Sequence, residues 1–347
     1  MRKSLILTFV MLLFADTANA DDWTVQSINL KAKPQSLTLK KNRKKLSSVR
    51  ILTEHGERLR IRPCGNQFCV EPVRRPARRR RLPARAIPDS IIARGKNNIR
   101  SAFLGDATQR YNHGVLGDNI EAGALYVFDL RKKQYKLTLG PDSVFEDLHA
   151  RLADVDKDGA DEIIVVRSYL TKGASLAVVE LGKIGLSIAA ETPAIGRPFR
   201  WLNPAGVADF DGDGWPEIAL VVTPHIGGTL QLWRYRGKKL ERILSLNGVS
   251  NHVKGSRILD MTAIADFYGD KIKDLAIPDA SRSNIRVLSF AGGQAKERAL
   301  ISLPGHLVTE ILWVRTKDKK KWVLVGGLDN GHLVIMAPPA SPDARRE

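Results

Sequence analysis

The chain is short of several features, and each shortage excludes a class of protein. Its 347 residues include two cysteines and 6% aromatic residues, and no stretch after the first twenty residues approaches 18 consecutive apolar residues. These shortages exclude a disulfide-rich scaffold and a later membrane-spanning helix. We find no nucleophile motif and no glycine-rich phosphate loop, so no familiar catalytic class is indicated. With 43% hydrophobic residues, the composition also excludes a fibrous or wholly disordered chain.

Acidic residues are scarce only near the N-terminus. Residues 21–100 hold 21 Lys and Arg against 6 Asp and Glu, whereas residues 101–347 hold 32 against 30. The formal charge of +18 therefore describes a basic N-terminal arm more than the rest of the protein. A compact nucleic-acid-binding enzyme usually spreads its basic surface over the folded domain, so this distribution argues against nucleic acid as the partner.

The first twenty residues have the three parts of a secretory signal peptide. Arg2 and Lys3 precede an apolar run from Leu5 to Phe14, and small residues flank position 19 in Ala-Asn-Ala. We expect cleavage after residue 20 and a periplasmic or secreted protein, with an uncleaved membrane anchor as the alternative. Export further disfavours nucleic-acid binding.

The two cysteines lie close together, in Cys64-Gly-Asn-Gln-Phe-Cys69. In an oxidising compartment such a pair can close a small disulfide loop across a hairpin. Zinc is the alternative, but two thiolates without a nearby His pair make an incomplete site. We therefore expect a Cys64–Cys69 disulfide.

The chain divides into five predicted segments. Weak alternation of apolar and polar residues predicts a small basic β-rich segment that includes the cysteines, and the Arg- and Pro-rich run after it reads as an exposed linker. The predicted segments are a signal peptide (1–20), the β-rich segment (21–72), the linker (73–97), a repeat domain (98–337) and a flexible tail (338–347).

A repeat of roughly 50 residues dominates the chain from residue 98 onward. An apolar strand after a glycine-containing turn recurs at Leu125, Leu176, Leu230, Ile285 and Leu333, and another short apolar run precedes each of the last four. Four strands per unit of this length are typical of a β-propeller blade. The sequence predicts an all-β fold with five readable blades. The last unit lacks an outer strand, so we expect a segment from before residue 98 to complete it and close the ring.

Two units carry an acidic loop directly before an apolar strand. Carboxylates at positions 1, 3, 5 and 9, with glycine at position 6, can wrap oxygen ligands around one hard cation such as calcium, and position 7 can add a backbone carbonyl. A solvated acidic turn is the alternative, but two copies at the same place in the repeat favour calcium. The two loops comprise Asp154, Asp156, Asp158, Ala160 and Glu162 in one unit, and Asp209, Asp211, Asp213, Trp215 and Glu217 in the next.

These loops and the strands that follow them resemble the FG-GAP or VCBS repeat propellers, which are related to the head of integrin alpha chains. The resemblance covers residues 98–336. It implies that the Asp and Glu residues of both loops are calcium ligands, with Ala160 and Trp215 contributing carbonyl oxygens. A third copy departs from the pattern, because Tyr268 stands at position 3 and Lys271 at position 6. Its remaining carboxylates, Asp266, Asp270 and Asp274, are expected to be metal-free.

The first repeat unit carries a different polar segment in place of an acidic loop. Because His and a carboxylate can act as acid and base, this segment could bind a ligand or support chemistry. A hydrogen-bonded blade corner is the alternative. Its candidate residues are Arg110, Tyr111, His113, Asp118 and Glu121.

The resemblance implies a binding scaffold, because such propellers serve in adhesion and in recognition of proteins or sugars. We expect an exported calcium-binding propeller that binds a protein or glycan partner in the cell envelope. The basic N-terminal region would meet anionic envelope polymers or lipid. The alternative is an enzyme, a lyase or hydrolase acting on polysaccharide, with the segment around His113 near its cleft. Fold alone does not decide between them.

Overall fold

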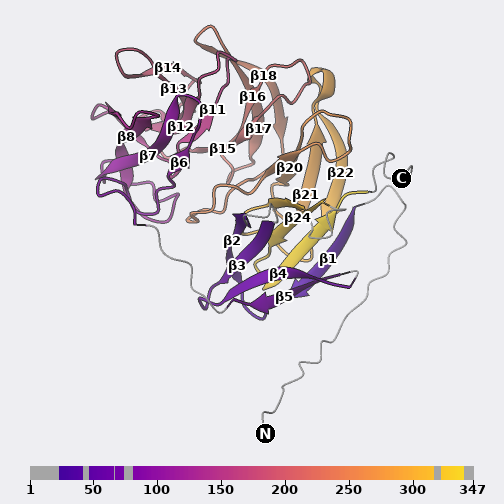
Figure 1. The fold of residues 1–347 in the computed structure, drawn as a ribbon. Helices are drawn as coiled ribbons and strands as arrows, with labels where there is room; N and C mark the ends of the chain where they lie inside the picture. Colours follow the sequence, from indigo (N-terminus) through magenta and orange to yellow (C-terminus); the bar gives the residue numbers. More distant parts are fainter. Residues whose placement is uncertain (1–22, 42–46, 66, 74–80, 316–321, 340–347) are drawn as a thin grey trace.

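A computed structural model describes residues 23–41, 47–65, 67–73, 81–315 and 322–339. Within these ranges every regular element is a β-strand except one 3-10 turn, Ala291–Gly293. The predicted all-β class is confirmed, and Figure 1 shows the strands gathered into successive sheets along the chain. The predicted signal peptide and the last eight residues lie outside the described ranges.

The strands form antiparallel sheets, most of them four-stranded meanders. The first sheet contains β2 (Pro34–Lys41), β3 (Ser47–Thr53), β4 (Arg58–Cys64) and β5 (Gln67–Pro72). A nine-stranded sheet contains β6 (Ala93–Arg94), β7 (Ile99–Thr108), β8 (Glu121–Asp129), β9 (Gln134–Thr138), β10 (Ser143–Phe145), β11 (Arg151–Ala153), β12 (Glu162–Tyr169), β13 (Gly173–Leu181) and β14 (Leu186–Glu191). It consists of two repeat units joined through β10, which contacts β8 at a single residue pair.

Two further meanders follow, and the last sheet joins both ends of the described chain. The meanders are β15 (Leu202–Ala208), β16 (Glu217–Val222), β17 (Thr229–Arg236) and β18 (Lys239–Asn247), then β19 (Ala263–Ala265), β20 (Asp274–Pro278), β21 (Asn284–Ser289) and β22 (Lys296–Ser302). The last sheet has the order β1-β25-β24-β23, with β1 (Thr24–Asn29), β23 (Leu312–Arg315), β24 (Trp322–Gly327) and β25 (His332–Ala337).

The apolar runs of the repeat are the central strands of these sheets. Residues 163–166 of β12 are all fully buried, as are residues 176–179 of β13. These two strands are apolar on both faces because one hydrophobic cluster packs them against residues of β7 and β8 and against residues of β15 to β17. Hydrophobic clusters accordingly join consecutive sheets, and the last of them packs β1 and β23 to β25 against β2 to β5.

The outer strand that the last repeat unit lacks comes from the start of the described chain. β1 pairs antiparallel with β25 from Thr24 opposite Ala337 to Asn29 opposite His332. Figure 1 shows β1, in indigo, beside the yellow C-terminal strands. The predicted completion by a segment before residue 98 is confirmed. This pairing covers an edge that would otherwise expose unpaired backbone groups.

The predicted basic β-rich segment is present as the four-stranded sheet β2 to β5, but it is a packed sheet, so its interpretation as an arm was wrong. Leu37, Val49 and Ile51 are at most 4% exposed, and their cluster includes β23 to β25 residues. The predicted linker also ends earlier than residue 97, because Ile87 is 1% exposed and β6 pairs with β7. The weak alternation seen in the sequence corresponds to an inward apolar face and an outward charged face.

The cysteine pair closes the β4–β5 hairpin as predicted. The sulfur atoms of Cys64 and Cys69 lie at bonding distance, and their Cα atoms are 5.7 Å apart. This Cα separation is typical of a disulfide. Cys64 pairs with Gln67 across the turn, so the bridge lies at the tip of the hairpin.

Candidate functional site

Three acidic loops join the first and second strands of three successive repeat units. We name them the first (residues 154–162), second (209–217) and third (266–274) acidic loop; they lie between β11 and β12, β15 and β16, and β19 and β20. In every loop, positions 4 and 6 have positive φ. The six residues are Lys157 (63°), Gly159 (87°), Gly212 (80°), Gly214 (89°), Gly269 (79°) and Lys271 (72°). The third loop keeps this shape with lysine where glycine is expected, so backbone shape alone does not indicate a metal.

The same hydrogen bonds hold all three loops. The carboxylate at position 1 accepts from the amide at position 6, with distances of 3.1, 2.9 and 2.9 Å in loop order. The carboxylate at position 9 accepts from the amide at position 2, at 2.9, 2.9 and 3.1 Å. Ala160 and Trp215, at position 7, donate their amides to the carboxylate at position 5. The loops therefore differ in side-chain charge more than in backbone geometry.

The first acidic loop concentrates carboxylates without a basic partner. Oxygens of Asp154, Asp156 and Glu162 lie within 4.8 Å of one another. Asp154 Oδ1 is buried and accepts no hydrogen bond, and none of the ion pairs in the described ranges includes this loop's carboxylates. Burial, together with the charges of the neighbouring aspartates, raises the pKa of Glu162 to about 8. An orphaned oxygen beside two other carboxylates fits a hard divalent cation.

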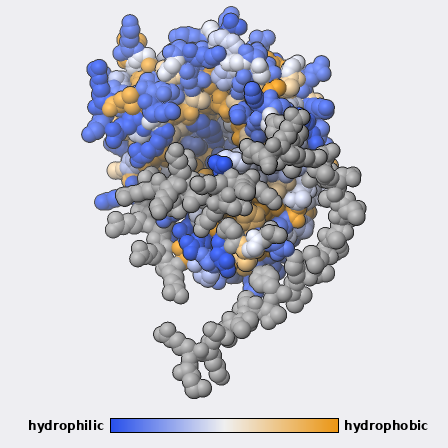
Figure 2. All heavy atoms as spheres, turned by 45° about the vertical axis from the view of Figure 1, so that its right-hand side comes forward, coloured by the Kyte–Doolittle hydropathy of each residue, from blue (hydrophilic) through white to orange (hydrophobic). Residues whose placement is uncertain are grey.

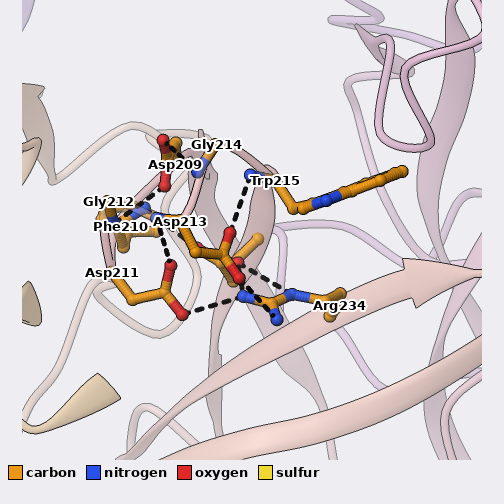
Figure 3. Close-up of polar contacts among 9 residues, drawn as sticks. Asp209, Phe210, Asp211, Gly212, Asp213, Gly214, Trp215 and Arg234 are labelled. Atoms are coloured by element: carbon orange, nitrogen blue, oxygen red, sulfur yellow. Dashed lines mark hydrogen bonds and ion pairs between the residues drawn. The ribbon is translucent and has the colours of Figure 1, made fainter. Parts of the chain in front are cut away.

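The second acidic loop has the same carboxylates and one additional group. Arg234, on β17, places Nη2 2.8 Å from Asp211 Oδ2 and 2.5 Å from Glu217 Oε1, and Nη1 3.0 Å from Asp213 Oδ2. Figure 3 shows the guanidinium pointing into the loop from the neighbouring strand. Burial raises the pKa of Glu217, whereas Arg234 lowers it. Oxygens of Asp209, Asp211 and Glu217 lie within 4.8 Å of one another, as the carboxylates of the first loop do, but here the guanidinium already neutralises part of their charge.

The third acidic loop has no close group of carboxylates among its described residues. Its three carboxylates are not among the close carboxylate groups in the described ranges. Arg298, on β22, lies 3.2 Å from Asp270, and Asp266 accepts three backbone amides. Burial raises the pKa of Asp274 to about 6.

A second candidate site lies at the opposite end of the strands. His113 Nδ1 and Glu146 Oε1 are 2.6 Å apart, and Ser168 donates to Glu146 Oε2 at 2.5 Å. Glu121 is 1% exposed, and neither of its carboxyl oxygens has a hydrogen-bond partner. Burial, followed by the charge of Glu146, raises the pKa of Glu121 to about 9. The carboxyl of Glu121 is therefore protonated at neutral pH, a state in which it can act as an acid.

An exposed aromatic residue borders this cluster. Phe199 is 45% exposed and has a φ of 54°, a conformation that is uncommon for a bulky side chain. Its ring stacks on Tyr111 with centroids 5.1 Å apart, and its amide donates to the Tyr111 hydroxyl. Strained residues of this kind cluster at ligand-binding sites.

Two histidines extend the cluster. His252 Nε2 lies 2.9 Å from the Ser256 carbonyl, so this nitrogen donates and Nδ1 is left to accept from His225, at 2.9 Å. Burial lowers the pKa of His225 to about 4 and that of His252 to about 3. Both rings are therefore neutral at physiological pH. Trp201, which contacts both rings, donates to the Glu146 carbonyl.

The candidate residues of the first repeat unit divide into two groups. Tyr111, His113 and Glu121 come together around Glu146. Arg110 instead donates to the Ser143 carbonyl, and Asp118 pairs with Arg257 at 2.6 Å. Sequence reasoning missed the residues that other repeat units supply, which are Glu146, Ser168, Phe199, Trp201, His225 and His252. Only contacts between repeat units mark them, so no motif could have found them.

Comparison with known proteins adds no relative to this description. No protein-family model matches the chain, and no curated protein matches it. No helix in the described ranges has the length and apolar character needed to cross a membrane.

Proposed function

We propose that the chain is an exported, calcium-stabilised β-propeller of the FG-GAP or VCBS type that acts as a binding scaffold for a protein or glycan partner in the cell envelope. The observation that carries the proposal is the recurrence of one acidic loop, with one hydrogen-bond frame, at the same place in three successive repeat units. The four-stranded meanders and the pairing of β1 with β25 support six blades in a ring.

In this proposal the first acidic loop holds calcium through Asp154, Asp156, Asp158 and Glu162. A bound cation would neutralise carboxylates that now face one another, and binding to the native state alone raises stability. The cation is structural, so the chemistry of recognition belongs to other residues.

Partner recognition is assigned to the loops opposite the acidic loops. Antiparallel strands put the β14–β15 and β16–β17 connections at that end, and these connections expose Phe199 and Ile226, which is 62% exposed. Exposed aromatic residues suit both protein and sugar partners. Figure 2 shows the hydrophobic residues of one face lying between larger hydrophilic areas.

The test is binding of envelope proteins and glycans to the purified chain, with and without chelator. Phe199→Ala should reduce binding, whereas Leu300→Ala, which truncates a residue 56% exposed on β22, should leave it unchanged. Equal binding by both variants would refute the assignment of the face.

The basic first sheet is proposed to contact anionic envelope polymers or lipid. Its attraction to anionic vesicles should weaken as salt screens the charges. Salt-independent binding would contradict this role.

An alternative function is polysaccharide cleavage at the Glu121 cluster. The observation that favours it is a buried carboxyl without hydrogen-bond partners, Glu121, near the His113–Glu146 pair. Burial and the charge of Glu146 raise its pKa to about 9. An acid and a base held close together could break a glycosidic bond. Release of new sugar ends from anionic polysaccharides, lost in both Glu121→Gln and Glu146→Gln, would establish this activity. If the parent releases no new sugar ends, the enzymatic alternative is refuted and the scaffold function stands.

A further inference from the structure

Strand register determines which residue faces the ninth position of each acidic loop. In the second loop, β16 pairs with β17 so that Glu217 lies directly opposite Arg234. The side chain of Glu217 is fully buried, and that of Arg234 is 20% exposed. The guanidinium therefore enters the loop from a fixed place on the next strand.

The corresponding place in the first loop carries the opposite charge. β12 pairs with β13 through Ile163 and Val179, and one further residue along this register places Glu180 opposite Glu162. Glu180 accepts a hydrogen bond from Tyr235 at 2.5 Å and lies 3.2 Å from Lys238. The residue opposite position 9 is thus a carboxylate beside the first loop and a cation beside the second.

The third loop has a neutral residue at this position. Leu275 pairs with Leu288, so Ser289 follows opposite Asp274. The three loops share one backbone conformation, but the residue opposite position 9 is acidic for the first loop, basic for the second and a serine for the third.

We infer that Arg234 is the resident cation of the second acidic loop, and that the chain takes up one calcium ion, in the first loop. The first-loop part of this inference rests on the proposed function. A guanidinium is always charged and matches carboxylates geometrically. Calcium entering the second loop would have to displace three ion pairs and then lie beside a positive charge. In the first loop calcium would meet the close carboxylates of Asp154, Asp156 and Glu162 and no guanidinium.

The experiment is equilibrium dialysis of the purified full chain against calcium, up to several times the range of about 0.1 to 1 mM typical of extracellular sites. The parent should bind one equivalent. Arg234→Gln should bind two, and Arg234→Lys, which retains a positive charge, should bind one. Asp156→Asn should abolish binding by the parent, whereas Asp211→Asn should leave it unchanged.

Glu180→Arg provides a test that leaves the second loop intact. It gives the first loop a guanidinium at the register position of Arg234, so calcium binding should be lost. If Arg234→Gln does not fold, Glu180→Arg still tests the inference. Calcium binding retained by folded Glu180→Arg would overturn it.

The remaining outcomes separate the inference from the proposed function. Two equivalents bound by the parent, reduced to one by Asp211→Asn, would overturn the inference. One equivalent bound by both the parent and a folded Arg234→Gln would also overturn it. No binding by the parent with one equivalent bound by Arg234→Gln would refute the first-loop calcium site and support the role of Arg234. No binding by either would refute both.

Discussion

Carboxylates lie within 4.8 Å of one another in both the first and the second acidic loop. Those of the first loop form no ion pair in the described ranges, whereas in the second loop Arg234 contacts three carboxylates. The backbones of the two loops match in their hydrogen bonds and in their positive φ angles. The comparison teaches that the loop motif specifies the backbone conformation of the loop. The residue opposite position 9 on the neighbouring strand then determines which cation neutralises the carboxylates.

The largest expected effect is the loss of Arg234. Arg234→Gln leaves Glu217 buried without its partner, and breaking such a pair costs about 3 kcal/mol of unfolding free energy. Denaturant unfolding in chelator measures this cost, and Arg234→Lys should cost less. Added calcium should restore much of the stability of Arg234→Gln. A cost below about 0.5 kcal/mol would mean that the ion pairs are solvated and do not stabilise the loop.

Calcium removal from the parent should have the next largest effect. Ligand at 100 times its dissociation constant stabilises the native state by about 2.7 kcal/mol, so chelator should lower the melting temperature. Asp156→Asn should remove this calcium dependence, and its matched partner Asp211→Asn should retain it. The opposite pattern between the two variants would place the ion in the second loop.

A smaller effect is expected where the two loops meet. Lys157 Nζ, in the first loop, lies 5.1 Å from the ring centroid of Trp215, in the second. Lys157→Ala removes a cation–π contact worth about 0.5 to 1 kcal/mol, with calcium and with chelator alike. Lys183→Ala, in an exposed turn, is the control for losing a lysine. A cost that appears only in calcium would show that Lys157 acts through the ion.

The smallest effect is expected from Glu180→Gln. Removing one charge near the first loop should weaken calcium affinity about twofold, as expected for a unit charge several ångströms away near water. Dialysis at several calcium concentrations resolves such a change. A tenfold or greater loss would indicate that Glu180 binds the ion directly.

Much of the fold follows from local sequence patterns. The apolar runs that begin at Leu176 and Leu230 are strands, and the cysteines close a hairpin, because strand alternation and turn spacing act over a few residues. The strands of the basic first sheet were also predicted, but not its packing against the last sheet, because the shared cluster joins residues far apart in the sequence, such as Leu37 and Val323.

The candidate sites were predictable only in part. The carboxylates of the acidic loops can be read from their spacing, since all their ligands lie within nine residues. Arg234 lies 17 residues after Glu217, and its role depends on the β16–β17 register, which the turn between the strands sets. Glu146, which pairs with His113 and lies near Glu121, comes from another repeat unit, so this arrangement depends on how whole sheets pack.

The most direct test of the account is a crystal structure of the chain grown in calcium chloride, with anomalous scattering used to locate the ions. We predict one calcium ion among Asp154, Asp156, Asp158 and Glu162, with the guanidinium of Arg234 still in contact with Asp211 and Glu217. An ion in the second acidic loop with Arg234 turned away, or no ion in the first, would contradict it.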